Sequence, residues 1–215
     1  MSTTAESSRP RFARMYRKSA ARADRRGAAG HRTRLLEGLR GRVVEVGAGH
    51  GLNFAHYPGT VTEVVAIEPE PNLRSDAEEA ATAAPVPVTV LAGTAEALSM
   101  GDGEMDGAVT SLVLCSVADQ AVALAEVHRV LRPGGELRFY EHVIAEHQPM
   151  RAVLKFADHS GLWPTIAGGC HPARDTGAAI KAAGFSIGRC ERFPFSASAL
   201  EPSVPHILGV ASRAT

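Results

Sequence analysis

The sequence predicts an α/β fold with a doubly wound, mostly parallel sheet. β-branched runs alternate with helix-compatible segments between residues 42 and 183. Residues 43–46 are apolar enough to be buried on both faces, apart from Glu45, which is typical of a parallel strand. Three closely spaced glycines follow this run, and glycine allows a sharp turn without Cβ interference; they are Gly47, Gly49 and Gly51.

The same alternation predicts each element in order. Strands are expected near residues 42–47, 62–68, 86–92, 106–114 and 136–142. Helices are expected near residues 10–26, 31–39, 51–56, 70–83, 118–131 and 173–183. Two further strands, 185–193 and 206–212, have only a Pro/Ser loop between them, so we expect an antiparallel pair at one sheet edge. Residues 1–9 are expected to be disordered.

Length and composition favour one globular domain over several. The chain has 215 residues, of which 45% are apolar. We expect a basic helical lid segment over residues 1–40 and a ligand-binding domain over residues 41–215. No apolar run approaches the ~20 residues that span a bilayer, and no secretory signal is visible. The three dispersed cysteines favour free thiols in a reducing cytoplasm; they are Cys115, Cys170 and Cys190.

A zero net charge hides a strong asymmetry. Residues 1–42 hold twelve Lys/Arg and three acids, 12 − 3 = +9, and the remainder holds eleven against twenty, −9. Either a basic helix covers an acidic body, or the segment contacts anionic lipid or an acidic partner. Nucleic acid is not expected, because only Phe12 and Tyr16 could stack on bases in this segment. No obligate protein partner is indicated.

The glycine turn favours S-adenosylmethionine (SAM) over a dinucleotide. A dinucleotide fingerprint reads Gly-x-Gly-x-x-Gly, but here the third glycine comes one residue early and Leu52 stands in its place. Glu45 adds a carboxylate on the strand before the turn. Glu68 ends the second strand about twenty residues later, where a carboxylate can accept both ribose hydroxyls, and Pro69 breaks the strand there. The plainer alternatives are a simple turn and a solvated or helix-capping glutamate.

A third polar segment follows the third predicted strand. Thr94, Ala95 and Glu96 could border an adenine ring, or Thr94 could cap a helix. The order Glu-x-Gly-x-Gly-x-Gly, strand-end Glu, Gly-Thr-Ala-Glu and Leu-Arg-Pro-Gly-Gly resembles class I SAM-dependent methyltransferases. This resemblance implies a seven-stranded Rossmann-like sheet with an antiparallel last strand.

A narrower resemblance extends from about Arg42 to Ala211. The segments that carry it are Leu112–Val117, Arg129–Gly135, Glu141-His142-Val143, Gly169-Cys170 with Arg174, and Pro205-His206-Ile207 with Gly209. They are similar to the methyltransferase-like 7 family, which includes membrane-associated alkyl thiol S-methyltransferases. The membrane-associated members carry an apolar N-terminal anchor, whereas this chain has a basic, polar helix there.

The resemblance also implies roles for particular residues. Glu45 and the three glycines would line the methionine end of SAM, Glu68 would hold the ribose, and Thr94–Glu96 would border the adenine. The turn formed by Leu114, Cys115 and Ser116 would lie beneath the sulfonium. A small-molecule acceptor, preferably a thiol, is then expected, because a thiolate needs little activation.

Candidates for the acceptor side are few. His142 follows the fifth strand and is the preferred base or acceptor-positioning residue, with His206 a weaker candidate. Arg174 could anchor an anionic group of the acceptor, or it could have a structural role such as capping a helix. Aromatic side chains that could cover the acceptor are Phe12, Tyr16 and Trp163.

No metal is expected from the spacing. Asp158, His159, Cys170 and His171 lack the paired spacing of a closed zinc site, and Cys115 and Cys190 are interpreted as core residues. Within the methyltransferases, a phospholipid amine or a quinone ring are alternative acceptors. An NAD(P)-dependent oxidoreductase is disfavoured by Leu52 and by the lack of a Tyr-x3-Lys pair, and a SAM-binding scaffold without activity stays open.

Overall fold

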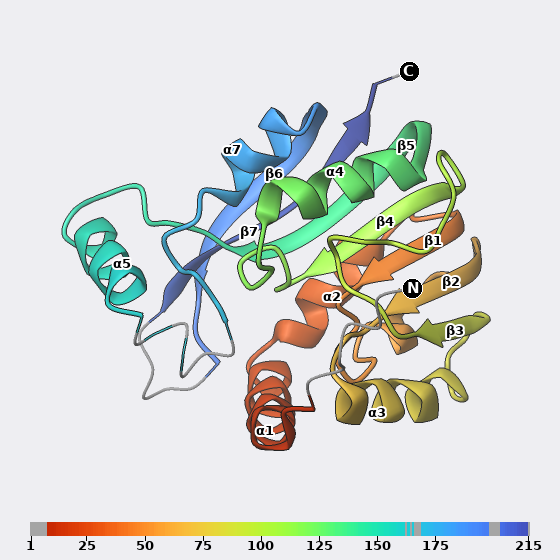
Figure 1. Ribbon diagram of the computed structural model, residues 1–215, viewed down its shortest axis with the longest axis horizontal. Helices are drawn as coiled ribbons and strands as arrows, with labels where there is room; N and C mark the ends of the chain where they lie inside the picture. Colours follow the sequence, from red (N-terminus) through yellow and green to blue (C-terminus); the bar gives the residue numbers. More distant parts are fainter. Residues whose placement is uncertain (1–7, 162, 164, 166–168, 198–202, 215) are drawn as a thin grey trace.

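A seven-stranded sheet forms the centre of the molecule (Figure 1). The computed structural model describes residues 8–161, 163, 165, 169–197 and 203–214. The strand order is β3-β2-β1-β4-β5-β7-β6. The strands are β1 Gly41–Val46, β2 Val61–Ile67, β3 Val88–Leu91, β4 Met105–Ser111, β5 Leu131–His142, β6 Phe185–Phe195 and β7 Val204–Arg213. The pairs among the first five strands are parallel, and β7 runs antiparallel to both β5 and β6.

Helices flank both faces of this sheet. They are α1 Pro10–Arg25, α2 Ala28–Leu36, α3 Pro71–Ala81, α4 Gln120–Val130, α5 Met150–His159 and α7 Thr176–Ala182, with a 3₁₀ turn η1 at Phe54–His56. The alternation of β1 divides the core, because successive side chains of a strand point to opposite faces. Val44 and Val46 pack in one cluster with α4 and α7, and Val43 packs in the other with α2 and α3. The doubly wound prediction is therefore confirmed, including the antiparallel pair in the tail.

One local prediction was wrong, one of two alternatives for Thr94 is decided, and one helix was missed. Residues 51–56 form no α-helix: Gly51 has a positive φ of 81°, and Pro58 soon follows the single 3₁₀ turn. Thr94 caps no helix, because it begins a tight turn in which the Ala97 N–H donates to its carbonyl at 3.3 Å. Helix α5 was not anticipated. The expected disorder of residues 1–9 falls mostly on residues 1–7, which lie outside the described residues.

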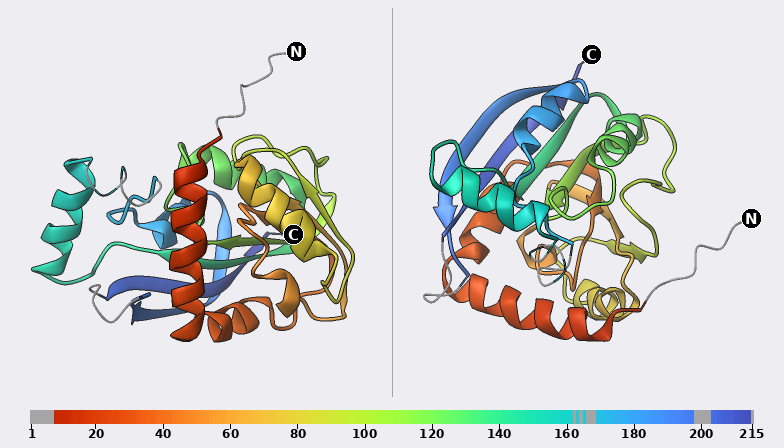
Figure 2. Two further views of the ribbon diagram at one scale, coloured as in Figure 1. Left: turned by 90° about the horizontal axis from the view of Figure 1, so that it is seen from below. Right: turned by 60° about the vertical axis from the view of Figure 1, so that its left-hand side comes forward.

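Helix α1 packs beside α2 and α3, whereas α5 stands away from the sheet (Figure 2). Arg17 of α1 pairs with Asp76 of α3, and the Arg9 N–H donates to Glu70 at 3.0 Å. The outward face of α1 carries exposed basic side chains at i, i+3 and i+4 spacing; they are Arg11, Arg14, Lys18, Arg22 and Arg25. Within the described part of the chain, none of the helices has the length and apolar character needed to cross a membrane.

Candidate active site

The glycine turn after β1 depends on left-handed backbone. Gly47, Gly49 and Gly51 have φ angles of 67°, 60° and 81°, which side chains with a Cβ rarely adopt. The Gly47 N–H donates to the Ile67 carbonyl at 2.8 Å, which ties the turn to the end of β2. A Cβ on Gly51 would lie 2.8 Å from the Cβ of Ala80, so the third glycine lets α3 approach the turn.

Glu68, directly after β2, faces this turn. Its carboxylate accepts hydrogen bonds from the Gly49 N–H at 2.7 Å and from the Glu70 N–H at 2.9 Å. The residue is 5% exposed, and burial raises the pKa of its carboxyl to about 7. Pro69 beside it is exposed. Because each carboxylate oxygen has a second lone pair, Glu68 keeps two acceptor positions for a ligand.

Glu45 is buried on the other side of the turn. It accepts hydrogen bonds from Asn53 Nδ2 at 2.8 Å and from the Tyr57 hydroxyl at 2.7 Å. Burial raises the pKa of this carboxyl to about 7, against the effect of both hydrogen bonds. Two carboxyl groups with pKa values raised toward neutrality therefore flank one glycine turn, a pattern typical of functional sites.

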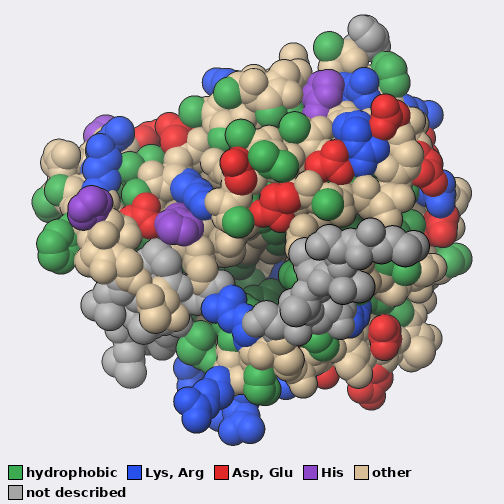
Figure 3. All heavy atoms as spheres, viewed as in Figure 1, with side chains coloured by type: hydrophobic (Ala, Val, Ile, Leu, Met, Phe, Trp, Pro, Cys, Tyr) green, Lys and Arg blue, Asp and Glu red, His purple; other side chains and the backbone are tan. Residues whose placement is uncertain are grey.

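A small cavity of about 10 Å³ lies beside the turn and is lined by Tyr16, Arg32, Glu45, Gly47, Ala48, His50, Leu52, Asn53 and Ser111. Two polar atoms that face it, His50 Nδ1 and Ser111 Oγ, are buried without a protein partner. Buried polar atoms are nearly always paired, so these two suit a polar ligand. Figure 3 shows that this side of the molecule is hollowed near its centre.

Tyr16 of α1 covers the same turn. A Cβ on Gly49 would lie 3.0 Å from its ring, and the ring stands edge-on to His50 at 5.5 Å. Burial raises the pKa of the Tyr16 hydroxyl to about 12. Phe12 lies one helical turn away, 5.9 Å from Tyr16 between ring centroids. Tyr16 therefore covers the expected donor end, whereas the sequence had placed both aromatics over the acceptor.

The turn after β4 is fixed by side chains from the end of β5 and from the loop before α7. Leu112 has a φ of 61°, and Glu141 accepts from the N–H groups of Val113 at 3.1 Å and Cys115 at 3.4 Å. Arg174 donates to the Leu114 carbonyl at 2.8 Å. The contact of Arg174 is therefore with the backbone of the turn. Of the two neighbouring residues at the end of β5, the sequence favours His142 for the pocket, and it carries no signal that Glu141 fixes this turn.

Cys115, His142 and Cys170 meet beneath this turn. His142 Nδ1 lies 3.6 Å from Cys115 Sγ and 3.4 Å from Cys170 Sγ. The His171 N–H donates to the Cys115 carbonyl at 2.7 Å and so holds the segment of Cys170 against the turn. His206 stands opposite His142 in the β5–β7 register, with ring centroids 4.4 Å apart.

The pKa values of this cluster shift in different directions. The hydrogen bond with Cys170, with burial, raises the pKa of Cys115, whereas the hydrogen bond with Cys115, assisted by Trp163, lowers the pKa of Cys170. Burial lowers the pKa of His206 to about 3, which keeps it neutral. Trp163 is half-buried and close to Cys170. The role of His142 as a base stays a prediction.

The remaining predicted residues are placed less centrally. Glu96 accepts from the Ala118 N–H at 2.9 Å and so links its turn to the loop before α4. Thr94 is exposed and Ala95 buried in the same turn, and Ser116 lies 3.5 Å from Cys115, oxygen to sulfur. Asp158 pairs with His171 at 2.7 Å. The four-residue zinc set that the spacing disfavoured is not assembled: among the described residues, the grouping that suits a metal is Cys115, His142 and Cys170.

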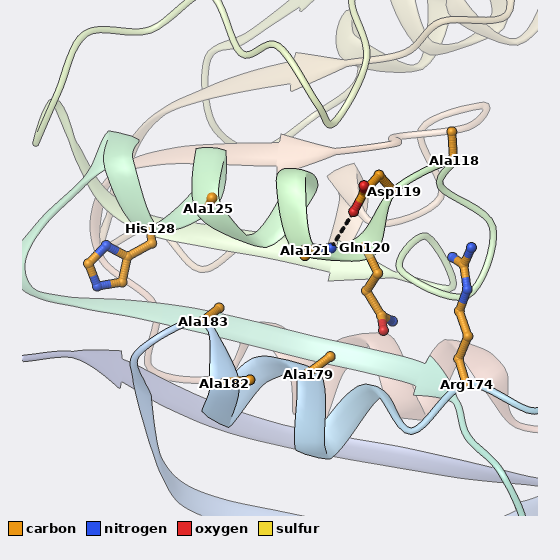
Figure 4. A pocket seen from close by; sticks show the side chains of 10 residues that line it. All are labelled: Ala118, Asp119, Gln120, Ala121, Ala125, His128, Arg174, Ala179, Ala182 and Ala183. Carbon is orange, nitrogen blue, oxygen red and sulfur yellow. Dashed lines mark hydrogen bonds between the residues drawn. The ribbon is translucent and has the colours of Figure 1, made fainter.

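A larger cavity of about 730 Å³ lies between α4 and α7 (Figure 4). Its lining is mostly alanine, and three of its polar side chains already have partners. Asp119 caps α4, Gln120 donates to the Leu114 carbonyl at 3.1 Å, and Arg174 donates to the same carbonyl. We therefore assign the candidate site to the glycine turn and the turn after β4.

Comparison with known proteins agrees with this geometry. A methyltransferase-domain family model matches residues 44–139. Thiol S-methyltransferase TMT1B of Mus musculus is 38% identical over 185 residues, which cover 83% of this chain and 74% of the mouse protein. Thiol S-methyltransferase TMT1A of Homo sapiens is 36% identical over 180 residues, 80% and 70% of the two chains.

Solved structures show the fold at lower identity. A putative methyltransferase from Bacillus halodurans matches with a TM-score of 0.72 at 16% identity, covering 87% of this chain and 99% of that one. A SAM-dependent methyltransferase from Thermotoga maritima matches with a TM-score of 0.68 at 21% identity, covering 95% and 97%. Sheet order, glycine turn and sequence relatives together identify the chain as a class I SAM-dependent methyltransferase that belongs to the methyltransferase-like 7 family.

Proposed function

We propose that this protein transfers the methyl group of SAM to a small thiol. The observation that carries the acceptor class is the pair of contacts from His142 Nδ1 to two cysteine sulfurs, at 3.6 and 3.4 Å, beside the turn after β4. The pocket already places two sulfur atoms against an imidazole ring, and the sulfur of a thiol substrate has the same chemistry. The thiol S-methyltransferase names of the mouse and human relatives support the same class.

The residues of the glycine turn fit SAM by their chemistry. Glu68 would accept the ribose hydroxyls, and Glu45, His50 and Ser111 would face the charged methionine end. The two unpaired polar atoms of this cavity would gain partners. Because the cavity of about 10 Å³ holds roughly one water, side chains that line it, Tyr16 among them, would have to move for the methionine end to enter. Tyr16 would then close over it and exclude water.

When bound, SAM supplies an electrophilic methyl carbon on a sulfonium, so the protein's part is alignment. Glu141 and Arg174 fix the turn of residues 112–116 from both sides through its N–H and carbonyl groups. A rigid turn beneath the reacting atoms restricts their approach, and orientation of this kind can supply ~7–11 kcal/mol. A thiol needs little more than deprotonation.

Turnover of SAM with a panel of acceptors tests the acceptor class. We expect an alkyl thiol to be methylated at least tenfold more efficiently, in kcat/KM, than a matched amine, phenol or quinol. The matched alcohol is the control, since it has the same carbon chain and differs only in the reacting atom. Preference for the amine or the quinol would instead support a phospholipid-amine or quinone methyltransferase.

We also propose that the basic face of α1 contacts anionic membrane surfaces. Each basic residue near such a surface contributes about 1 kcal/mol, so the double variant Arg14→Glu/Lys18→Glu should bind phosphatidylserine vesicles at least about 30-fold more weakly. The control Lys181→Glu/Arg189→Glu makes the same charge change on exposed residues of α7 and β6. If both double variants lost the same amount of vesicle affinity, or if vesicle binding by the parent protein did not depend on salt, α1 would not be the membrane-contacting surface.

A further inference from the structure

Three soft metal ligands converge from segments far apart in the sequence. Cys115 comes from the turn after β4, His142 from the end of β5 and Cys170 from the loop before α7. Their ligand atoms all lie within 4.8 Å of one another. Both cysteines are buried and free of disulfides. His142 is 27 residues from Cys115 and 28 from Cys170 in the sequence, so the short spacings typical of metal motifs do not reveal this grouping.

The distances match the edges of a tetrahedron around zinc. Zinc lies about 2.3 Å from thiolate sulfur and about 2.0–2.1 Å from imidazole nitrogen. A tetrahedral angle between such bonds places sulfur and nitrogen about 3.6 Å apart. The two separations here, both measured from His142 Nδ1, are 3.6 Å to Cys115 and 3.4 Å to Cys170. The third edge, between the two sulfurs, lies within 4.8 Å, against about 3.8 Å for two thiolates on a tetrahedral zinc, so one ion can reach all three atoms after a small adjustment.

Hydrogen bonds to the backbone hold Cys115, His142 and the segment next to Cys170 in place. Glu141 accepts from the Cys115 N–H at 3.4 Å, and the His171 N–H donates to the Cys115 carbonyl at 2.7 Å. Thr176 Oγ1 donates to the His142 carbonyl at 3.4 Å. Such supporting contacts orient ligands and tune metal affinity. They fix the three ligands on different elements before any ion binds.

We propose that Cys115, His142 and Cys170 form a zinc site with one open coordination position. Among the described residues, no fourth Cys, His, Asp or Glu joins the group. Zinc sites with three protein ligands keep the fourth position for water or substrate, whereas structural sites have four protein ligands. This arrangement assigns His142 as a metal ligand in place of the base expected from the sequence.

The open position suits the acceptor itself, an extension that rests on the proposed thiol methylation. A thiol that binds zinc loses its proton to solvent, since a coordinating thiol is deprotonated. Its sulfur lone pair then forms a bond to the methyl carbon as the bond from that carbon to the sulfonium sulfur breaks. Both products are neutral thioethers, so no oxidant or reductant is required. The methylated product has lost its anionic charge and leaves the zinc more readily.

Metal analysis of the purified full-length protein tests the site directly. We expect one zinc per chain, and cobalt substitution should give thiolate-to-cobalt charge-transfer absorption. Cys115→Ser, His142→Ala and Cys170→Ser should each weaken zinc binding at least about tenfold. Cys190→Ser is the matched control, because Cys190 is an exposed free cysteine on β6, and its zinc affinity should equal that of the parent. Circular dichroism and thermal melting verify that each variant folds.

The outcomes separate the metal from the reaction. Zinc-free protein that binds SAM but takes up no zinc, or ligand variants that bind zinc like Cys190→Ser, would overturn the site. Addition of an alkyl thiol to the cobalt form should change its absorption, and an unchanged spectrum would overturn thiol coordination. Zinc bound without any thiol methylation would refute the proposed function alone, whereas full thiol methylation by chelator-treated protein would refute the role of zinc alone.

Discussion

Replacement of Glu68 by alanine is expected to weaken SAM binding at least tenfold, about 1.4 kcal/mol. The carboxylate already accepts from Gly49 and Glu70 and keeps two further acceptor positions. Hydrogen bonds to a charged group contribute about 1.5–3 kcal/mol, so loss of the ribose contacts alone accounts for this change. Isothermal titration calorimetry measures it. Glu78→Ala, at an exposed position on α3, is the control and should bind SAM like the parent.

Protonation of Glu68 should also make the affinity for SAM depend on pH. The pKa of its carboxyl is about 7 in the free protein because of burial, and only the ionised form offers both oxygens as acceptors. Below this pKa the protein must release a proton to bind, so affinity should rise with pH up to about 7 and then level off. In Glu68→Gln, SAM affinity should no longer rise with pH over this range, because glutamine does not titrate. Unchanged affinity in Glu68→Ala would show that Glu68 does not hold the ribose.

Gly209→Ala is expected to destabilise the fold by about 3 kcal/mol, the upper end of the usual cost of overpacking. A Cβ at this position in β7 would lie 2.3 Å from the Arg189 carbonyl oxygen and 2.5 Å from the Phe139 ring. The oxygen belongs to the backbone of the neighbouring strand β6, so it cannot rotate away as a side chain could. The strands β5, β7 and β6 would have to separate.

Urea denaturation measures this effect against a close control. Gly188 lies on β6, and the nearest atom to its added Cβ is the Val210 carbonyl oxygen at 4.0 Å, an ordinary contact. Gly188→Ala should therefore stay within about 1 kcal/mol of the parent, the cost typical of a benign surface or strand substitution. Similar denaturation midpoints for the two variants would show that β7 has room at Gly209.

Local features of the site were predictable from sequence, and features assembled by distant segments were not. The glycine turn and Glu68 were identified because strand, turn and strand-end acid recur at fixed spacing. The helix expected over residues 51–56 failed because the chain after Gly51 reaches Pro58 within two turns. Thr94 begins a turn where a cap was one of two alternatives.

The grouping of Cys115 with Cys170 shows the limit most clearly. Cys115 and Cys190 were interpreted as core residues; Cys115 is buried, but Cys190 is exposed on β6, so that half of the interpretation was wrong. Nothing in the spacing placed Cys170 beside Cys115. That placement depends on the loop before α7 folding back onto the turn after β4 through one backbone hydrogen bond, from His171 to Cys115. Contacts of this kind arise from tertiary packing and leave no periodic signal.

The strand order has a consequence for synthesis on the ribosome. β7 follows β6 in the chain but inserts between β5 and β6, where His206 pairs with His142. Until β7 emerges, β5 exposes an unpaired edge of the kind that promotes aggregation. The nascent chain can thus complete the glycine turn early but cannot finish the sheet beside His142. The glycine turn and the sheet edge beside His142 are therefore completed at different times, and the edge beside His142 comes last.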